Sequence, residues 1–137
     1  MTADLTTEPG LATILIVEDS PDNMKLFSTL LTLRGHHIVG LSGGEGLLEA
    51  LERTMPDLIL MDIQLPGRDG FALLQDIRAS AHRGRRVIAL TAHAMSGDRE
   101  RAISAGFSGY ITKPIDIRTF PAEVEAALPA EGSTDAS

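Results

Sequence analysis

Five short runs of aliphatic residues, each followed by a longer stretch with helical spacing, constrain the fold of this chain more than any other feature. The runs are rich in Ile, Val and Leu, which is typical of strands that are buried on both faces. Strands that alternate with helices predict a parallel sheet covered by helices on both sides. We expect strands at 13–17, 37–41, 57–61, 86–90 and 109–112.

The stretches between these runs carry helix signals. Ser20 and Pro21 are typical of an N-cap and a first helical position, and Gly35 is typical of a helix end. Pro121 must lie in the first turns of the last helix or kink it. The further helices are expected at 43–53, 71–78, 98–105 and 116–128.

Right-handed crossovers leave few topologies for such a chain, and the doubly wound, flavodoxin-like α/β fold with strand order 2-1-3-4-5 and five helices is the natural choice. The 137 residues suffice for one domain, expected at 13–128. Residues 1–12 and 129–137 lack periodicity and are expected to be flexible tails.

The balance of charge and the residue usage exclude several classes. With 19 acidic and 12 basic residues the net charge is -7, which disfavours nucleic acid and anionic membranes as partners. The absence of cysteine excludes disulfides, thiolate metal sites and thiol nucleophiles. The sequence has no signal-peptide pattern and no apolar run near the ~18 residues of a membrane span, so a cytoplasmic protein is expected.

Reactive side chains follow four of the five predicted strands. Ligands bind beyond the carboxyl ends of the strands in open α/β sheets, and these ends meet at one edge. We therefore expect a single site that contains Glu18, Asp19, Asp62, Thr91 and Lys113.

The chemistry of this set points to phosphoryl transfer with a metal ion. Three neighbouring carboxylates repel one another unless a cation joins them, and oxygen ligands suit Mg²⁺. A carboxylate can also attack phosphorus, which forms an aspartyl phosphate. We assign Asp62 as the acceptor because a central strand would carry it, whereas the adjacent pair Glu18 and Asp19 suits metal binding. Lys113 would neutralise incoming charge and the Thr91 hydroxyl would hydrogen-bond a phosphoryl oxygen.

Four stretches together carry a resemblance to a known family. They are ILIVEDSPDN from Ile14, DLILMDIQLP from Asp57 with Asp69-Gly70 after it, VIALTA from Val87, and GYITKP from Gly109. The sequence resembles the receiver domain of two-component response regulators over about 13–128. The joint pattern is highly specific, although each motif alone is weak.

The resemblance implies roles for matching residues at the site. It implies that Asp62 is the phosphoacceptor and that Lys113 contacts the phosphoryl group. It also implies a Mg²⁺ site made of Glu18, Asp19, Asp62 and the backbone carbonyl of Gln64. In many members the acidic pair is Asp-Asp, where this chain has Glu-Asp.

The resemblance further implies a switch and a response. Thr91 and Tyr110 would be the switch pair, and the Lys113-Pro114 bond would be cis. Phosphorylation by a sensor histidine kinase or a histidine phosphotransfer protein would change the surface around residues 95–128. A downstream protein target, or onward transfer of the phosphoryl group, would then carry the signal. Gln64 and His93 occupy positions that influence the phosphoryl lifetime.

The tails at both ends favour a stand-alone receiver, with a module of a larger hybrid kinase left open, and we expect a switch rather than an enzyme that turns over other substrates. Three alternatives stay open. A phosphatase or phosphotransferase with an Asp nucleophile usually needs an acid two residues later, where this chain has Gln64. A flavin or nucleotide binder needs a Gly- or hydroxyl-rich loop after the first strand, where Glu18 and Asp19 lie. The third is a scaffold that acts without phosphorylation.

The remaining polar residues have plainer interpretations. Tyr110 lies in a strand, where a partly buried core role competes with switching. Arg83, Arg85 and Arg86 are interpreted as a solvated loop. No two histidines have metal-ligand spacing, and we expect surface or turn positions for His36, His37, His82 and His93.

Overall fold

The protein forms a five-stranded parallel sheet between two layers of helices. The computed structural model describes residues 12–65, 67, 69–92 and 97–128, so most of both predicted tails and His93 lie outside the described residues. The elements are β1 (Thr13–Val17), α2 (Pro21–Thr32), β2 (His37–Leu41), α3 (Leu47–Thr54), β3 (Leu58–Asp62), α4 (Gly70–Arg78), β4 (Val87–Thr91), α5 (Asp98–Ala105), β5 (Gly109–Thr112) and α6 (Phe120–Ala126). The strand order β2-β1-β3-β4-β5 confirms the flavodoxin-like prediction.

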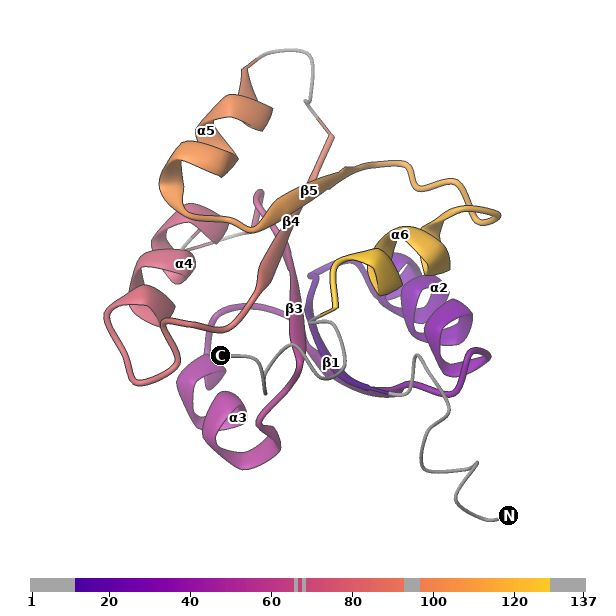
Figure 1. Ribbon diagram of the computed structural model, residues 1–137, viewed down its shortest axis with the longest axis horizontal. Helices are drawn as coiled ribbons and strands as arrows, with labels where there is room; N and C mark the ends of the chain where they lie inside the picture. The colour runs from indigo at the N-terminus through magenta and orange to yellow at the C-terminus, as the bar shows by residue number, and fades with distance from the viewer. Residues whose placement is uncertain (1–11, 66, 68, 93–96, 129–137) are drawn as a thin grey trace, which may run out of the picture.

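The two faces of the sheet are covered by different helices. Figure 1 shows α3, α4 and α5 on one side of the sheet and α2 and α6 on the other. Alternate residues of a strand point to opposite faces, so each central strand supplies both cores. Leu15 and Met61 belong to the core under α3, α4 and α5, and Ile16 and Leu60 belong to the core under α2 and α6. This double burial explains the continuous apolar runs of the sequence.

The strands that carry the site end later than the sequence predicted. β3 and β4 are each shifted by one residue, so Asp62 and Thr91 are the last residues of their strands rather than the first residues after them. Asp57 lies before β3, and its Oδ2 accepts a hydrogen bond from Thr13 N at 2.9 Å. The expected convergence of reactive side chains does not depend on this shift.

Two predicted helices are shorter in the structure. α3 begins at Leu47 rather than at residue 43 because the glycines before it make a turn: Gly46 has φ 79°. A Cβ at Gly44 would lie 2.5 Å from Leu73 Cδ2, so this turn packs closely on α4. α6 covers only Phe120–Ala126, with Pro121 in its first turn as predicted.

The prediction for the histidines was wrong for His36, which is 3% exposed and lies outside the turns. His82 lies in a turn as expected, although it is only 6% exposed, and His37 is exposed as expected. The interpretation of the arginine loop was wrong for Arg85, which is half-buried and donates to Pro56 O at 2.9 Å. His36 contacts the carboxylate of Glu125 and Arg85 contacts the carbonyl of Pro56, both far away in the sequence, and local sequence patterns carry no sign of such partners.

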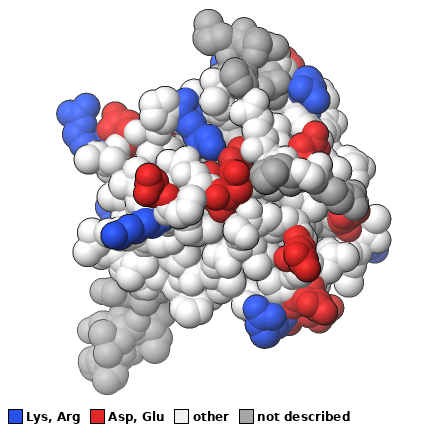
Figure 2. All heavy atoms as spheres, turned by 180° about the vertical axis from the view of Figure 1, so that it is seen from behind, with Lys and Arg blue, Asp and Glu red and all other residues white. Residues whose placement is uncertain are grey.

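The face of the molecule seen in Figure 2 is mixed in charge. On the face shown in Figure 2, acidic and basic side chains are interspersed, and this face has no continuous basic surface of the kind that nucleic acid requires. In the part of the chain that the structure describes, no helix is both long enough and apolar enough to cross a membrane.

Candidate metal and phosphoryl site

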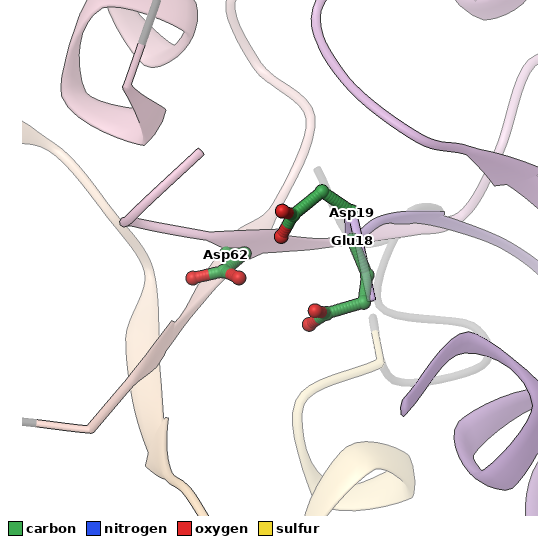
Figure 3. A group of neighbouring side chains, drawn as sticks. All are labelled: Glu18, Asp19 and Asp62. Carbon is green, nitrogen blue, oxygen red and sulfur yellow. The ribbon is translucent and has the colours of Figure 1, made fainter. Parts of the chain in front are cut away.

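Three carboxylates meet at the carboxyl edge of the sheet. Val17 pairs with Met61 in the register of β1 and β3, which places Glu18 and Asp19 beside Asp62. Oxygens from all three side chains lie within 4.8 Å of one another, and Figure 3 shows the carboxylates directed toward a shared space. Glu18 and Asp62 are only 2% and 3% exposed, whereas Asp19 is exposed. The structure thus brings the predicted acidic residues together.

Lys113, the residue directly after β5, completes this group. Its Nζ donates to Asp62 Oδ2 at 3.0 Å and to Glu18 Oε1 at 3.4 Å. Its backbone N–H donates to Thr91 O at 2.7 Å, and the Lys113-Pro114 bond is cis, as the family resemblance implied. Burial lowers the pKa of the Lys113 ammonium, but hydrogen bonds and charge from Asp62 and Glu18 outweigh burial and raise it overall. Lys113 therefore stays positively charged.

One ammonium does not balance three carboxylates. Burial raises the pKa of Glu18, and the charge of Asp62 raises it further. Hydrogen bonds from Ser20 N at 3.1 Å and Asn23 Nδ2 at 3.4 Å offset only part of this effect. The excess negative charge and the hard oxygen donors fit a divalent cation such as Mg²⁺.

The loop after β3 is shaped around Asp62. Gln64 N donates to Asp62 Oδ1 at 2.9 Å, whereas Lys113 contacts Oδ2, so each carboxylate oxygen has its own donor. Gly70 N donates to Ile63 O at 2.8 Å, and a Cβ at Gly70 would lie 2.6 Å from Asp62 O. Only glycine permits this close approach, a role that sequence analysis treated simply as turn chemistry.

Thr91 and Tyr110 lie in β4 and β5, on the side of Asp62 away from Glu18 and Asp19. Thr91 is 1% exposed, and it comes one residue after Leu90, the register partner of Asp62. Tyr110 pairs with Ala89, so Tyr110 and Thr91 share the face of the sheet that α4 and α5 cover. Tyr110 is half-buried against that core. This placement is compatible with a core role and with a switch role for Tyr110.

A hollow that the sequence analysis missed adjoins Lys113. Its volume is about 310 Å³, and it opens between the start of α2 and the segment after β5. One signal in the sequence was available, because Leu26 is an apolar residue that lies off the predicted buried face of its helix. In the structure the Leu26 side chain is 37% exposed. The hollow is lined by Asn23, Leu26, Phe27, Ala92, Lys113, Pro114 and Ile115.

Comparison with known proteins identifies the family. The model of the response regulator receiver domain matches residues 14–125, and the chain belongs to this family. Receiver domains are signalling switches of two-component systems rather than classical enzymes, and the phosphorylation-dependent switch predicted from sequence fits this class. The alternative functions receive no support from the comparisons.

Curated relatives include proteins of very different length. The chain is 39% identical over 109 residues to the sensor protein GacS of Pseudomonas syringae and 41% identical over 114 residues to the histidine kinase BarA of Shigella flexneri. These matches cover 77% and 82% of this chain but only 12% of each relative. The polar-differentiation response regulator DivK of Brucella abortus is 39% identical over 116 residues, which cover 84% of this chain and 94% of DivK.

A solved structure agrees with the fold and with the site chemistry. The receiver domain of a sensor histidine kinase of Pseudomonas aeruginosa has a TM-score of 0.77 at 34% identity, over 85% of this chain and 97% of that chain. That structure has a magnesium ion coordinated in its active-site cleft. A chemotaxis protein of Vibrio cholerae has a TM-score of 0.80 at 21% identity, which supports the fold alone.

Proposed function

We propose that Asp62 accepts a phosphoryl group from a histidine kinase or a histidine phosphotransfer protein and that this modification switches the protein between two surfaces. The observation that supports this most is the convergence of three carboxylates and Lys113 at the carboxyl edge. A Mg²⁺ ion would be held by Glu18, Asp19, Asp62 and the carbonyl of Gln64. It would neutralise the charge of the phosphoryl oxygens.

The residues of the chain divide the chemistry among them. A carboxylate oxygen of Asp62 attacks phosphorus, and the bond from phosphorus to the donor imidazole nitrogen breaks. The leaving imidazole then takes a proton from solvent. Gln64 N and Lys113 Nζ hold the two Asp62 oxygens in one orientation, and Lys113 lies where charge collects on the phosphoryl group. Thr91 supplies a hydroxyl at the neighbouring strand end.

The switch follows from the added charge. A phosphoryl group adds roughly 1.5 to 2 negative charges at the site. A hydrogen bond from the Thr91 hydroxyl to this group would draw Thr91 toward Asp62 and change the space available to Tyr110. The surface around residues 95–128 would respond, of which the structure describes 97–128. A downstream protein would read this change.

The hollow beside Lys113 suits the approach of a phosphodonor. Leu26, Pro114 and Ile115 offer apolar surface next to the ammonium, so a partner can seat apolar side chains while its phosphohistidine reaches Asp62. That several relatives are receiver domains of sensor kinases supports a kinase as partner.

The test is covalent labelling by a small phosphodonor. The protein is incubated with acetyl phosphate with and without Mg²⁺, and its intact mass is recorded. We expect a Mg²⁺-dependent gain of one phosphoryl group that Asp62→Asn abolishes. Asp57→Asn is the matched control, because Asp57 is an exposed carboxylate directly before β3, at the opposite end from Asp62.

Absence of labelling in the wild-type protein, under conditions that label another receiver domain, would contradict the proposal. It would favour the phosphorylation-independent scaffold. Labelling that survives in Asp62→Asn would instead move the acceptor to another residue.

A further inference from the structure

The guanidinium of Arg99 lies over the ring of Tyr110. The distance from Arg99 Cζ to the ring centroid is 5.2 Å, within the range of a cation–π interaction. Arg99 is the second residue of α5, and Tyr110 is the second residue of β5. The contact therefore joins the start of one element to the strand that follows it.

The dipole of α5 does not favour an arginine at this position. The N-terminus of a helix carries partial positive charge, so a cation in the first turn is unfavourable. Arg99 and Arg101 both lie in that first turn, and both cover aromatic rings: Arg101 Cζ is 4.4 Å from the centroid of Phe71. Contact with the rings is a physical reason for two arginines where the helix dipole opposes them.

Apolar packing holds α5 only weakly. Of its described side chains, only Ala102 is fully buried, and Ile103 is 50% exposed. The arginine–aromatic contacts therefore form a substantial part of the attachment of α5 to the rest of the domain. A change in the position of the Tyr110 ring would therefore alter the contact of Arg99 and, with it, the packing of α5.

We infer that Arg99 is a positioning residue for Tyr110: its guanidinium holds the ring in the observed position and links that position to α5. The part of this inference that concerns switching rests on the proposed function. Tyr110 shares a face with Thr91, so a movement of Thr91 toward Asp62 reaches Arg99 through this ring. Under the proposed function, phosphorylation favours a second position of the Tyr110 ring, and loss of the Arg99 contact makes that position easier to reach.

The size of the effect follows from the exposure of Arg99. Exposed cation–π contacts change an equilibrium by about two- to fivefold. A ligand that selects the second position then binds about two- to fivefold more tightly, because the competent state is more populated. The overall fold does not depend on this exposed side chain.

The sequence provides a specific probe. Tyr110 is the only tyrosine and the chain has no tryptophan, so intrinsic fluorescence reports on this ring alone. Acrylamide quenching is measured in the unphosphorylated protein for wild type, R99Q, R99K and R101Q. We expect stronger quenching in R99Q and partial restoration in R99K. R101Q, which removes the equivalent contact to Phe71 from the same helix, should resemble wild type.

A second measurement tests the link to the switch. Each protein is titrated with beryllium fluoride, a phosphoryl mimic, in the presence of Mg²⁺, and the change in tyrosine fluorescence is followed. The beryllium fluoride concentration that gives half of the fluorescence change should fall about two- to fivefold in R99Q and remain unchanged in R101Q.

The outcomes separate this inference from the proposed function. Equal quenching and equal midpoints in wild type and R99Q would overturn the role of Arg99 while leaving phosphorylation of Asp62 intact. Equal shifts in R99Q and R101Q would also overturn it, since they would reflect a general loosening of α5. Failure of wild type to gain a phosphoryl group from acetyl phosphate counts against the proposed function, whereas the quenching result is independent of it.

Discussion

Two groups of charged side chains lie at opposite edges of the sheet, and their balance of charge differs. The carboxyl-edge cluster consists of Glu18, Asp19, Asp62 and Lys113. The amino-edge cluster consists of Arg34, His36 and Glu125. The first has more carboxylates than cations, whereas the second surrounds one carboxylate with an arginine and a histidine.

The pKa values of the two glutamates record this difference. Burial raises the pKa of Glu18 and the charge of Asp62 raises it further. Burial also raises the pKa of Glu125, but hydrogen bonds from Arg34 and His36 outweigh burial and lower it overall. His36 has a fully buried side chain whose Nε2 lies 2.9 Å from Glu125 Oε2, while Nδ1 has no hydrogen-bond partner among the described residues. Nε2 is therefore the ring nitrogen that contacts the carboxylate.

The difference in charge balance distinguishes a functional site from a contact that only stabilises the fold. A cluster whose charges are satisfied stabilises the fold and needs no ligand. A cluster with excess negative charge costs stability unless a cation binds, and such unfavourable electrostatics are typical of functional sites. The amino-edge cluster joins α6 to the end of α2, and Figure 1 shows these helices side by side.

The largest expected effect concerns Lys113. Lys113→Met should lower the rate of phosphoryl uptake from acetyl phosphate by about 10²–10³-fold, because one donor to the developing charge is lost. Intact mass measured against time gives this rate. Lys25→Met, which removes the other lysine of the chain from an exposed position on α2, should react like wild type. An unchanged rate in Lys113→Met would remove Lys113 from the chemistry.

The second effect concerns Glu125. Glu125→Gln should lower the free energy of unfolding by about 2 kcal/mol near neutral pH, because charge-assisted hydrogen bonds to Arg34 and His36 are lost. The folded pKa of Glu125 lies below its usual 4.5. Its contribution is therefore present above about 4.5 and lost as the pH falls through the folded pKa.

Urea unfolding of wild type and Glu125→Gln near pH 7 and near pH 3 checks this dependence. Phosphoryl uptake should be equal in the two proteins. A stability difference that is the same at both pH values would show that Glu125 acts through packing rather than charge.

The third effect concerns Mg²⁺. At ten times its dissociation constant, a cation that binds only the folded state raises the free energy of unfolding by about 1.4 kcal/mol. Asp19→Asn should weaken this response, since it replaces a charged carboxylate ligand with a neutral amide, and Glu125→Gln should leave it unchanged. Thermal unfolding with and without Mg²⁺ measures the response. Equal responses in wild type and Asp19→Asn would exclude Asp19 as a ligand.

The smallest effect has the opposite sign to that of Glu125. Glu18→Gln should raise the free energy of unfolding of the metal-free protein by about 1 kcal/mol near pH 8, because it removes an unbalanced buried charge. The folded pKa of Glu18 is raised, so the cost of the charge is fully present above the folded pKa and disappears as the pH falls below its usual 4.5. Urea unfolding in the presence of a chelator tests this. A lower free energy of unfolding in Glu18→Gln would show that the charge of Glu18 stabilises the fold, as that of Glu125 does, and would contradict the difference between the two clusters.

The parallel sheet and the position of its site were predictable from the sequence. Central strands bury both faces, so β1 and β3 are recognisable as continuous apolar runs, and the carboxyl ends of parallel strands must meet at one edge. Asp62 and Lys113 lie 51 positions apart, yet the topology alone was enough to predict their proximity. The exact strand ends were not predictable, because Asp62 and Thr91 extend their strands as polar residues.

The environment of the other polar side chains was not predictable. His36 is paired with Glu125, 89 positions away, and neither residue belongs to a motif or a periodic pattern. The contact of Arg99 with Tyr110 likewise depends on where α5 packs. Such polar contacts form where the ends of helices pack against other elements. Hydrophobic periodicity predicts which face of a helix is buried, but it does not predict these contacts.

The sequence by itself determined the order of strands and helices along the chain and the edge at which reactive side chains gather, because burial of apolar faces and the handedness of crossovers leave few arrangements. Only the tertiary structure decided which charges are balanced. The pKa of a buried carboxylate depends on neighbours within a few ångströms, and packing brings these neighbours from distant parts of the chain. Glu18 and Glu125 are the same residue type, and their surroundings alone give their charges opposite effects on stability.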